Sequence, residues 1–299
     1  MKKNLSRFVA VAAAMLVSLN LMAATMPKWS DVDYAGDGIE GHKLDIYVPD
    51  DGKTLHKVVV LIYGSAWFSN RDKQKAFECI GQPLVDAGFA VVSINHRAST
   101  EARFPAQIND VKAAIRYVRA HARAYGFDTS FVGITGYSSG GHLASLTGTT
   151  NGVKTYAVGK ETVDIEGEVG QCLGSSSKVS AVVDWFGPID MMRMDNCSAP
   201  KDGKSPEAVL LGVAPAENPD LVALLGPATY LDRKDPMFLV IHGDADPVVP
   251  YCQSERFAEA LKAKGLLWDF VTVPGGKHGP VTFNKETMQR MVEFFQKQK

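Results

Sequence analysis

Residues 131–144 decide the fold and read FVGITGYSSGGHLA. The apolar run 131–134 has the composition of a strand buried on both faces, and Leu143 begins a segment with helical character. Between them lies the GxSxG pentapeptide Gly136-Tyr137-Ser138-Ser139-Gly140. A strand, a tight turn and a helix in this order expose a serine above a sheet, and glycine on each flank avoids a steric clash. The pattern predicts a nucleophilic Ser138 rather than a Gly/Ser turn without chemistry.

Ser139 is the alternative nucleophile, but the two glycines of the pentapeptide are centred on Ser138. The residue that follows the nucleophile donates its backbone N–H to the negative charge that develops on the substrate. We therefore expect Ser139 to form part of an oxyanion hole.

A serine nucleophile needs a base, and on this architecture the acid and then the histidine follow the serine. Only His242 and His278 come well after Ser138. His278 lies in the flexible loop GGKHGP, beyond the last apolar run, and is the expected base. We expect His242, which ends an apolar run, to support its loop, and His142 to pack behind the nucleophile.

The acid is expected in HGDADPVVP (residues 242–250), which follows the apolar run 237–241. Asp246 and Asp244 compete for the role. Asp246 lies further into the loop and is the better candidate to orient the imidazole of His278. Asp244 is the alternative, and the aspartate without this role is expected to cap a turn.

Short apolar runs alternate with helical patterns from residue 42 to the end of the chain. The runs are 44–48, 58–63, 90–94, 131–134, 179–186, 237–241 and 270–273. This alternation predicts an α/β fold with a mostly parallel central sheet and helices on both faces. No linker divides the chain, so we expect one domain over 25–299, with a cap-like insertion at about 187–234.

The first 24 residues resemble a secretory signal, with three positive charges, an apolar core and small residues at positions 23 and 24. The alternative, a membrane anchor, needs about 20 apolar residues, more than this core provides. Cleavage removes three positive and no negative charges, so the net charge of −1 becomes −4. We expect an exported protein, periplasmic or secreted. The balanced charge and the 45% hydrophobic content exclude low-complexity disorder and a nucleic-acid binder that relies on bulk charge.

Four cysteines, at positions 79, 172, 197 and 252, would face an oxidising compartment after export. Their spacing lacks a CxxC pair, which argues against a zinc site. Cys172 and Cys197 flank one apolar run and are the first choice for a disulfide. Free buried thiols are the alternative.

The motifs together resemble the α/β-hydrolase superfamily, and within it the hormone-sensitive-lipase-like esterases. The resemblance covers nearly all of 40–297 and includes FPAQINDVKAAIRY at 104–117 and VVDWFGPID at 182–190. It is greatest to the bacterial xylan/feruloyl-esterase-like branch. One motif departs from that family, which carries His-Gly-Gly-x-Trp where this chain has Tyr63-Gly64-Ser65-Ala66-Trp67.

The resemblance implies an oxyanion hole built from the N–H groups of Ser65, Ala66 and Ser139, since backbone donors survive side-chain changes. Tyr63 replaces the usual histidine and is expected to support the loop or to touch the substrate. Tyr63, Trp67 and Trp185 are the candidate walls of the substrate pocket, together with Phe186, although buried tryptophan in a sheet protein is often core.

The implied function is that of an exported serine carboxylic-ester hydrolase, first a carbohydrate esterase that removes acetyl or feruloyl groups from hemicellulose. The alternatives are a general short-chain carboxylesterase, an amide hydrolase of exopeptidase or arylformamidase type, and a catalytically silent binding protein. No step of the mechanism requires a metal or an organic cofactor. The expected partner is a small-molecule or oligosaccharide ester, with no nucleic acid and no membrane after signal cleavage. An ion pair between Arg97 and Asp110 is expected to be structural.

Overall fold

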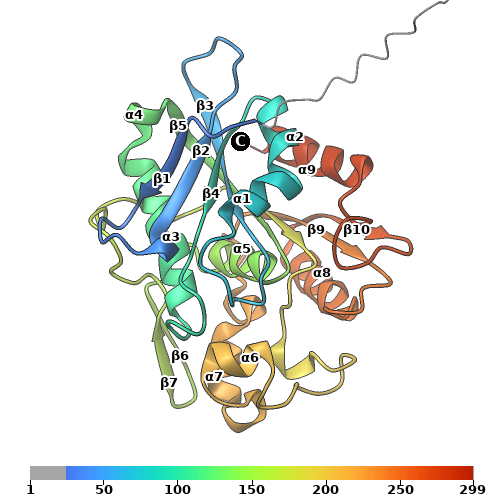
Figure 1. Cartoon of the computed structure of the whole chain (residues 1–299). Helices are drawn as coiled ribbons and strands as arrows, with labels where there is room; N and C mark the ends of the chain where they lie inside the picture. The colour runs from blue at the N-terminus through green and yellow to red at the C-terminus, as the bar shows by residue number, and fades with distance from the viewer. Residues whose placement is uncertain (1–24, 299) are drawn as a thin grey trace, which may run out of the picture.

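The structure is a computed structural model that describes residues 25–298 (Figure 1). The predicted signal therefore lies outside the described residues. A single eight-stranded sheet has the order β1-β2-β4-β3-β5-β8-β9-β10 and runs through the centre of the molecule. Its strands are β1 (Trp29–Asp33), β2 (Lys43–Tyr47), β3 (His56–Ile62), β4 (Ala90–Ile94), β5 (Phe127–Tyr137), β8 (Ala181–Trp185), β9 (Met237–Gly243) and β10 (Leu267–Val273).

The seven predicted apolar runs are all strands of this sheet. From β4 to β10 the neighbouring strands pair in parallel, whereas β1 with β2 and β2 with β4 pair antiparallel. The prediction of a mostly parallel sheet is thus confirmed. The edge strand β1 was not predicted, because it has little apolar content and none of its residues is buried.

Helices cover both faces of the sheet, as predicted. They are α1 (Lys73–Ala76), α2 (Gln82–Asp86), α3 (Ala106–Ala120), α4 (Ala122–Tyr125), α5 (Ser139–Thr149), α6 (Pro206–Leu211), α7 (Pro219–Leu225), α8 (Cys252–Lys264) and α9 (Lys285–Lys297). Side chains of α3, α5 and α8 pack in the core on one face, and those of α1, α2 and α9 pack in the core on the other. Within β3, Val58 and Val60 point to the first core and Val59 and Leu61 to the second. This two-residue alternation explains why the strand is apolar at every position from Val58 to Ile62.

The stretch 187–234 holds α6, α7 and three short 3₁₀ turns, η3 (Met191–Arg193), η4 (Pro215–Glu217) and η5 (Pro227–Tyr230). These elements lie below the sheet in Figure 1, on the side of α5. The interpretation of 25–299 as one domain with a cap stays a prediction.

A further segment outside the central sheet, which the sequence did not predict, connects α5 to β8. It forms the two-stranded hairpin of β6 (Thr155–Val158) and β7 (Glu161–Asp164). The hairpin lies beside α7, where Asn218 Nδ2 donates to Glu161 Oε1 at 2.9 Å and the Lys160 N–H donates to Asp220 Oδ2 at 3.1 Å. The hairpin and the stretch 187–234 therefore stabilise one another at the same end of the molecule.

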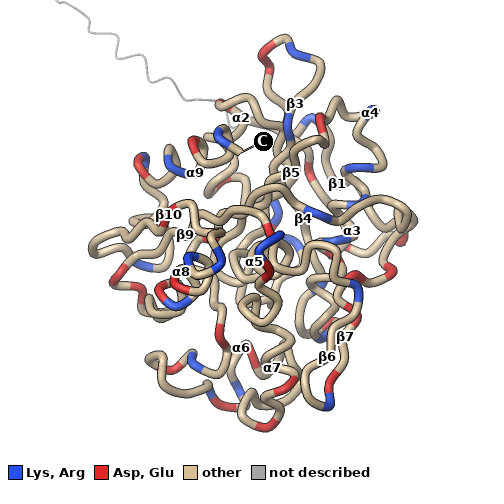
Figure 2. Tube along the Cα trace, turned by 180° about the vertical axis from the view of Figure 1, so that it is seen from behind, with Lys and Arg blue, Asp and Glu red and all other residues tan. Residues whose placement is uncertain are grey.

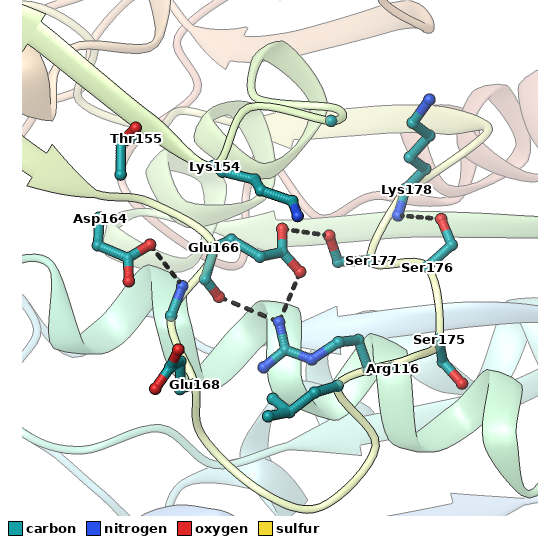
Figure 3. A pocket seen from close by; sticks show the side chains of 13 residues that line it. Arg116, Lys154, Thr155, Asp164, Glu166, Glu168, Ser175, Ser176, Ser177 and Lys178 are labelled. Carbon is teal, nitrogen blue, oxygen red and sulfur yellow. Dashed lines mark hydrogen bonds and ion pairs between the residues drawn. The ribbon is translucent and has the colours of Figure 1, made fainter.

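A cavity of about 420 Å³ is lined by Arg116 of α3 and by polar side chains of the segment after β7 (Figure 3). Arg116 on α3 donates to the Glu166 backbone carbonyl at 3.0 Å and forms an ion pair with its carboxylate. Ser177 donates to the same carboxylate at 2.7 Å, and Lys112 Nζ lies 3.3 Å from it. Because Arg116 and Lys112 are buried, Glu166 neutralises two cations that would otherwise be costly to bury.

Candidate active site

Ser138 lies at the sharp turn between β5 and α5, with φ 56° and ψ −127°. A non-glycine residue in this region is strained, and such strain is typical of functional sites. A Cβ atom at Gly64 would lie 2.6 Å from Ser138 Cβ, and Cβ atoms at Gly136 and Gly140 would collide with backbone carbonyls. These glycines let the β3 loop and the turn approach one another closely enough to present the serine.

His278 connects Ser138 to Asp246. Its Nε2 lies 2.9 Å from Ser138 Oγ, and its Nδ1 lies 2.7 Å from Asp246 Oδ2. In the tautomer that satisfies both contacts, Nδ1–H donates to the carboxylate and Nε2 accepts from the serine hydroxyl. The structure thus brings together three side chains that lie as much as 140 residues apart in sequence.

The carboxylate of Asp246 has three partners besides His278, namely two N–H groups of its own loop and the ring of His242 at the end of β9. The N–H groups of Val248 and Val249 donate to Oδ1 at 2.8 and 3.0 Å. Burial alone would raise the pKa of Asp246, but hydrogen bonds from His242, His278 and the Val248 N–H hold that pKa well below its ordinary value. The group is therefore an anion throughout the ordinary pH range and can stabilise a positively charged imidazole.

Asp244, the alternative acid, does not reach His278. It is exposed, and its Oδ1 accepts from the Gly275 N–H at 2.7 Å, so it caps a turn. His242 has the supporting position predicted for it. Its Nδ1 lies 2.7 Å from Ser254 Oγ, and its Nε2 faces the Val249 carbonyl at 3.2 Å and Asp246 at 3.3 Å.

His142 is packed behind Ser138, as predicted. It is fully buried in the first turn of α5, and its Nε2 lies 3.0 Å from the Leu225 carbonyl oxygen of the insertion. Its ring meets Trp67 edge to face, with centroids 5.3 Å apart. Burial lowers the pKa of His142 to about 4, so the ring is neutral at pH 7.

The three N–H groups predicted as oxyanion donors differ in whether they are free to bind a substrate oxygen. The Ser65 N–H donates to Ser139 Oγ at 2.9 Å, so it is already bonded and the expectation for Ser65 needs correction. Besides the backbone N–H predicted as an oxyanion donor, Ser139 thus has a side chain that holds the β3 loop. Ala66 adopts φ 51°, and no described residue accepts a hydrogen bond from its N–H. The N–H groups of Ala66 and Ser139 remain as candidate donors.

Two cavities open on either side of Ser138. The larger, about 400 Å³, is bounded by His278 and by aromatic and apolar side chains. These side chains are Cys79, Tyr137, Phe186, Val248, Pro280 and Phe283. The smaller cavity, about 60 Å³, lies between Ser138 and the insertion and is lined by Trp67, Met194, Lys201, Glu207 and Val249 among others.

The predicted pocket walls are only partly correct. Trp67 lines the smaller cavity, and Phe186 lines the larger one with its ring centroid 4.6 Å from that of His278. Tyr63 and Trp185 are 0% exposed and belong to the core instead. Trp185 points from β8 into the face covered by α9, and the Tyr63 hydroxyl donates to the Ser69 carbonyl at 2.9 Å, which is the loop-supporting role.

The predicted disulfide Cys172–Cys197 is wrong. Cys197 pairs with Cys252 at the start of α8, with a Cα–Cα distance of 6.3 Å, whereas Cys79 and Cys172 are free thiols. The segment of Cys172 lies instead near the start of the described chain, where the neighbouring Gly170 packs against Tyr34 and Ala35.

The remaining expectations concern an ion pair, metal sites, membrane-spanning helices and the distribution of charge. Arg97 and Asp110 form the expected ion pair, with Arg97 Nη2 2.6 Å from Asp110 Oδ1. Within residues 25–298, no cluster of side chains has the composition of a metal site, and no helix is long and apolar enough to cross a membrane. Basic and acidic residues are interspersed along the described trace (Figure 2).

A family model described as BD-FAE matches residues 44–261. The chain belongs to the BD-FAE family, whose members are esterases of the α/β-hydrolase fold. A curated relative of this BD-FAE chain, esterase LipQ of Mycobacterium tuberculosis, is 31% identical over 254 residues, which are 83% of the chain and 56% of LipQ. The chain spans about half the length of the curated relatives it matches.

Two solved structures are more similar in sequence. A bifunctional GH43-CE protein of Bacteroides eggerthii is 63% identical, with a TM-score of 0.89 over 90% of this chain and 35% of that one. A truncated carbohydrate esterase from gut microbiota is 53% identical, with a TM-score of 0.90 over 92% of this chain and 97% of that one. The predicted α/β-hydrolase fold is therefore confirmed.

Proposed function

We propose that this BD-FAE chain hydrolyses carboxylic esters with Ser138 as nucleophile, His278 as general base and Asp246 as the residue that orients the imidazole. The observation that carries the proposal is the position of His278, which is within hydrogen-bond distance of both other side chains. A serine hydroxyl is a weak nucleophile, and an adjacent base oriented by a third group is the arrangement that activates it.

In the proposed mechanism, Ser138 Oγ attacks the ester carbonyl carbon as His278 Nε2 takes the hydroxyl proton. The N–H groups of Ala66 and Ser139 donate to the oxyanion of the tetrahedral intermediate. The bond to the leaving alcohol breaks, and His278 gives that alcohol its proton. Water then attacks the acyl-enzyme with His278 again as base, which releases the acid and restores Ser138.

The proposed substrates are acyl esters of carbohydrates, with acetyl or feruloyl groups of hemicellulose such as xylan as the first candidates. Support comes from the two similar structures, one named a carbohydrate esterase and the other a GH43-CE protein. A general short-chain carboxylesterase is the competing proposal, because LipQ is named only as an esterase. The partner in either case is a small-molecule or oligosaccharide ester.

We also propose that the protein is exported to the periplasm or beyond. The signal-like residues 1–24 support this, and so does the disulfide between Cys197 and Cys252, because disulfides persist in oxidising compartments. A tagged full-length chain is expected in the periplasmic or medium fraction with its N-terminus cleaved near residue 24. Recovery of the uncleaved chain in the cytoplasm would contradict export.

The test of the activity compares the wild type with Ser138→Ala on p-nitrophenyl acetate and on arabinoxylan oligosaccharides that carry acetyl and feruloyl esters. We expect the wild type to release acid and the variant to lose at least about a thousandfold in kcat. A variant as active as the wild type would refute the role of Ser138. Fast cleavage of butyrate esters with no release from the oligosaccharides would favour the general carboxylesterase.

A further inference from the structure

The smaller cavity beside Ser138 contains two buried polar groups without partners. Glu207, in α6, is 3% exposed and its Oε2 has no hydrogen-bond partner. Trp67, in the β3 loop, is 2% exposed and its Nε1 likewise has none. Both side chains line the same cavity of about 60 Å³, together with Ser138.

A buried carboxyl oxygen without a partner costs free energy, and most such groups in proteins have a partner. Lys201 also lines the cavity, but no ion pair joins it to Glu207 among the described residues. The Glu207 side chain therefore lines the space beside the proposed nucleophile with an oxygen that has no hydrogen-bond partner.

The chemistry of the two groups restricts what that substrate group can be. Glu207 Oε2 accepts a hydrogen bond, whereas Trp67 Nε1 can only donate one. A hydroxyl satisfies both, because it donates and accepts at the same atom. An ammonium group cannot accept from Trp67, and a carboxylate cannot donate to Glu207.

We propose that Glu207 is a specificity-determining residue that accepts a hydrogen bond from a hydroxyl of the ester substrate, and that Trp67 donates to the same hydroxyl. The proposal rests on the proposed ester hydrolysis at Ser138 and narrows its substrates to hydroxyl-bearing esters. Two sources of this hydroxyl share the chemistry. One is the phenolic hydroxyl of a hydroxycinnamoyl acyl group, and the other is a sugar hydroxyl next to the esterified position.

The cavity size agrees with this assignment. A volume of about 60 Å³ is large enough for a hydroxyl and the carbon that bears it, since one water occupies about 30 Å³ in the liquid. Sites built to bond a substrate hydroxyl reject analogues without it far more strongly than apolar pockets reject a missing methylene.

The experiment measures kcat/KM for two matched pairs of esters. Methyl 4-hydroxycinnamate and methyl cinnamate differ in the acyl hydroxyl, and trans-2-hydroxycyclohexyl acetate and cyclohexyl acetate differ in an alcohol-side hydroxyl. The readout for each pair is the preference, the ratio of kcat/KM with the hydroxyl to kcat/KM without it. The proteins are the wild type, Glu207→Met, Glu207→Gln, Trp67→Phe and the exposed control Glu217→Met.

We expect a preference in one pair, which identifies the source of the hydroxyl. Glu207→Met removes the acceptor and should lower that preference about tenfold or more, while Glu207→Gln, which keeps an acceptor oxygen, should restore part of it. Trp67→Phe should lower the same preference, and Glu217→Met should leave it within about twofold of the wild type.

The inference is overturned if the wild type has no preference in either pair, or if Glu207→Met and Trp67→Phe both keep the wild-type preference. Because the readout is a ratio, a variant that merely loses stability lowers both rates together and does not mimic the expected result. Failure of the proposed function is a different outcome, namely no hydrolysis of any of the four esters by the folded wild type.

Discussion

His142 should make the stability of this protein depend on pH. The ring is fully buried against Trp67, and its pKa is about 4 in the folded chain, against an ordinary value of 6.5. An unfolded chain binds a proton at this histidine below pH 6.5, whereas the folded chain stays neutral there until about pH 4. The contribution of His142 to the free energy of unfolding is therefore most favourable above pH 6.5 and falls as the pH is lowered towards 4.

The size of this effect follows from the same values. At roughly 1.4 kcal/mol for each tenfold difference in proton affinity, His142 costs about 3 kcal/mol between pH 6.5 and 4, of which about 2 kcal/mol is lost by pH 5. Asp184 acts in the opposite direction, because burial raises its pKa to about 6 and its stabilising effect is lost as the pH rises from about 4 to 6. The wild-type curve alone would thus hide both effects.

The measurement is urea unfolding of the wild type and His142→Gln at pH 8 and pH 5. Glutamine can still donate to the Leu225 carbonyl but does not titrate, so the variant should gain about 2 kcal/mol relative to the wild type when the pH is lowered. Asp184→Asn should change in the opposite sense over the same interval. If the difference between His142→Gln and the wild type is the same at both pH values within about 0.5 kcal/mol, burial does not set the protonation of His142.

Three further perturbations test other parts of the structure. Asp246→Asn should lower kcat on p-nitrophenyl acetate by about 10³ to 10⁴, because the imidazole of His278 loses its orienting anion, and a loss below tenfold would contradict this role. Cys252→Ser should lower the free energy of unfolding by about 4 kcal/mol, because the disulfide closes a loop of 55 residues and so restricts the unfolded chain. Equal unfolding midpoints of the wild type and the variant under oxidising conditions would show that the disulfide does not contribute. Glu166→Met should cost about 3 kcal/mol or more, because it leaves the buried cations Lys112 and Arg116 unpaired, and an unchanged urea midpoint would refute the importance of this network.

The sheet could be predicted because its strands are buried on both faces. Such strands are apolar over most of their length, so the runs at β3, β4 and β9 are visible without any knowledge of their partners. The hairpin of β6 and β7 could not be predicted in this way. Most of its residues are exposed, and it is held by polar contacts to α7 that only the folded chain creates.

The candidate site was predictable where local geometry determines the chemistry. The glycines around Ser138 and the loops of Asp246 and His278 carry their own sequence patterns, and the structure places the three side chains in contact. Side chains whose roles depend on distant partners were assigned less well. Nothing local indicates that Ser139 Oγ accepts from Ser65, or that Cys197 lies beside Cys252 rather than nearer to Cys172.

Trp185 and Phe186 are neighbouring aromatic residues whose different roles could not be predicted from the sequence. Trp185 ends β8 and follows the strand alternation into the core, whereas Phe186 adopts φ 43° and turns into the larger cavity. A residue that leaves the strand at a positive φ no longer obeys the two-residue alternation. The sequence alone gives the two aromatic residues the same apparent chance to line the pocket.

The disulfide between Cys197 and Cys252 has a mechanical consequence for the way a polymer would reach Ser138. It ties the insertion to the first residue of α8, six positions after Asp246, and Arg256 adds a hydrogen bond to the Cys197 carbonyl at 3.2 Å. The insertion is thus anchored to the same segment that carries the proposed acid. We therefore expect it to keep one position beside Ser138 rather than to open and close over it. A long chain would then have to reach Ser138 past Val248, which is 50% exposed and lines both cavities beside the serine.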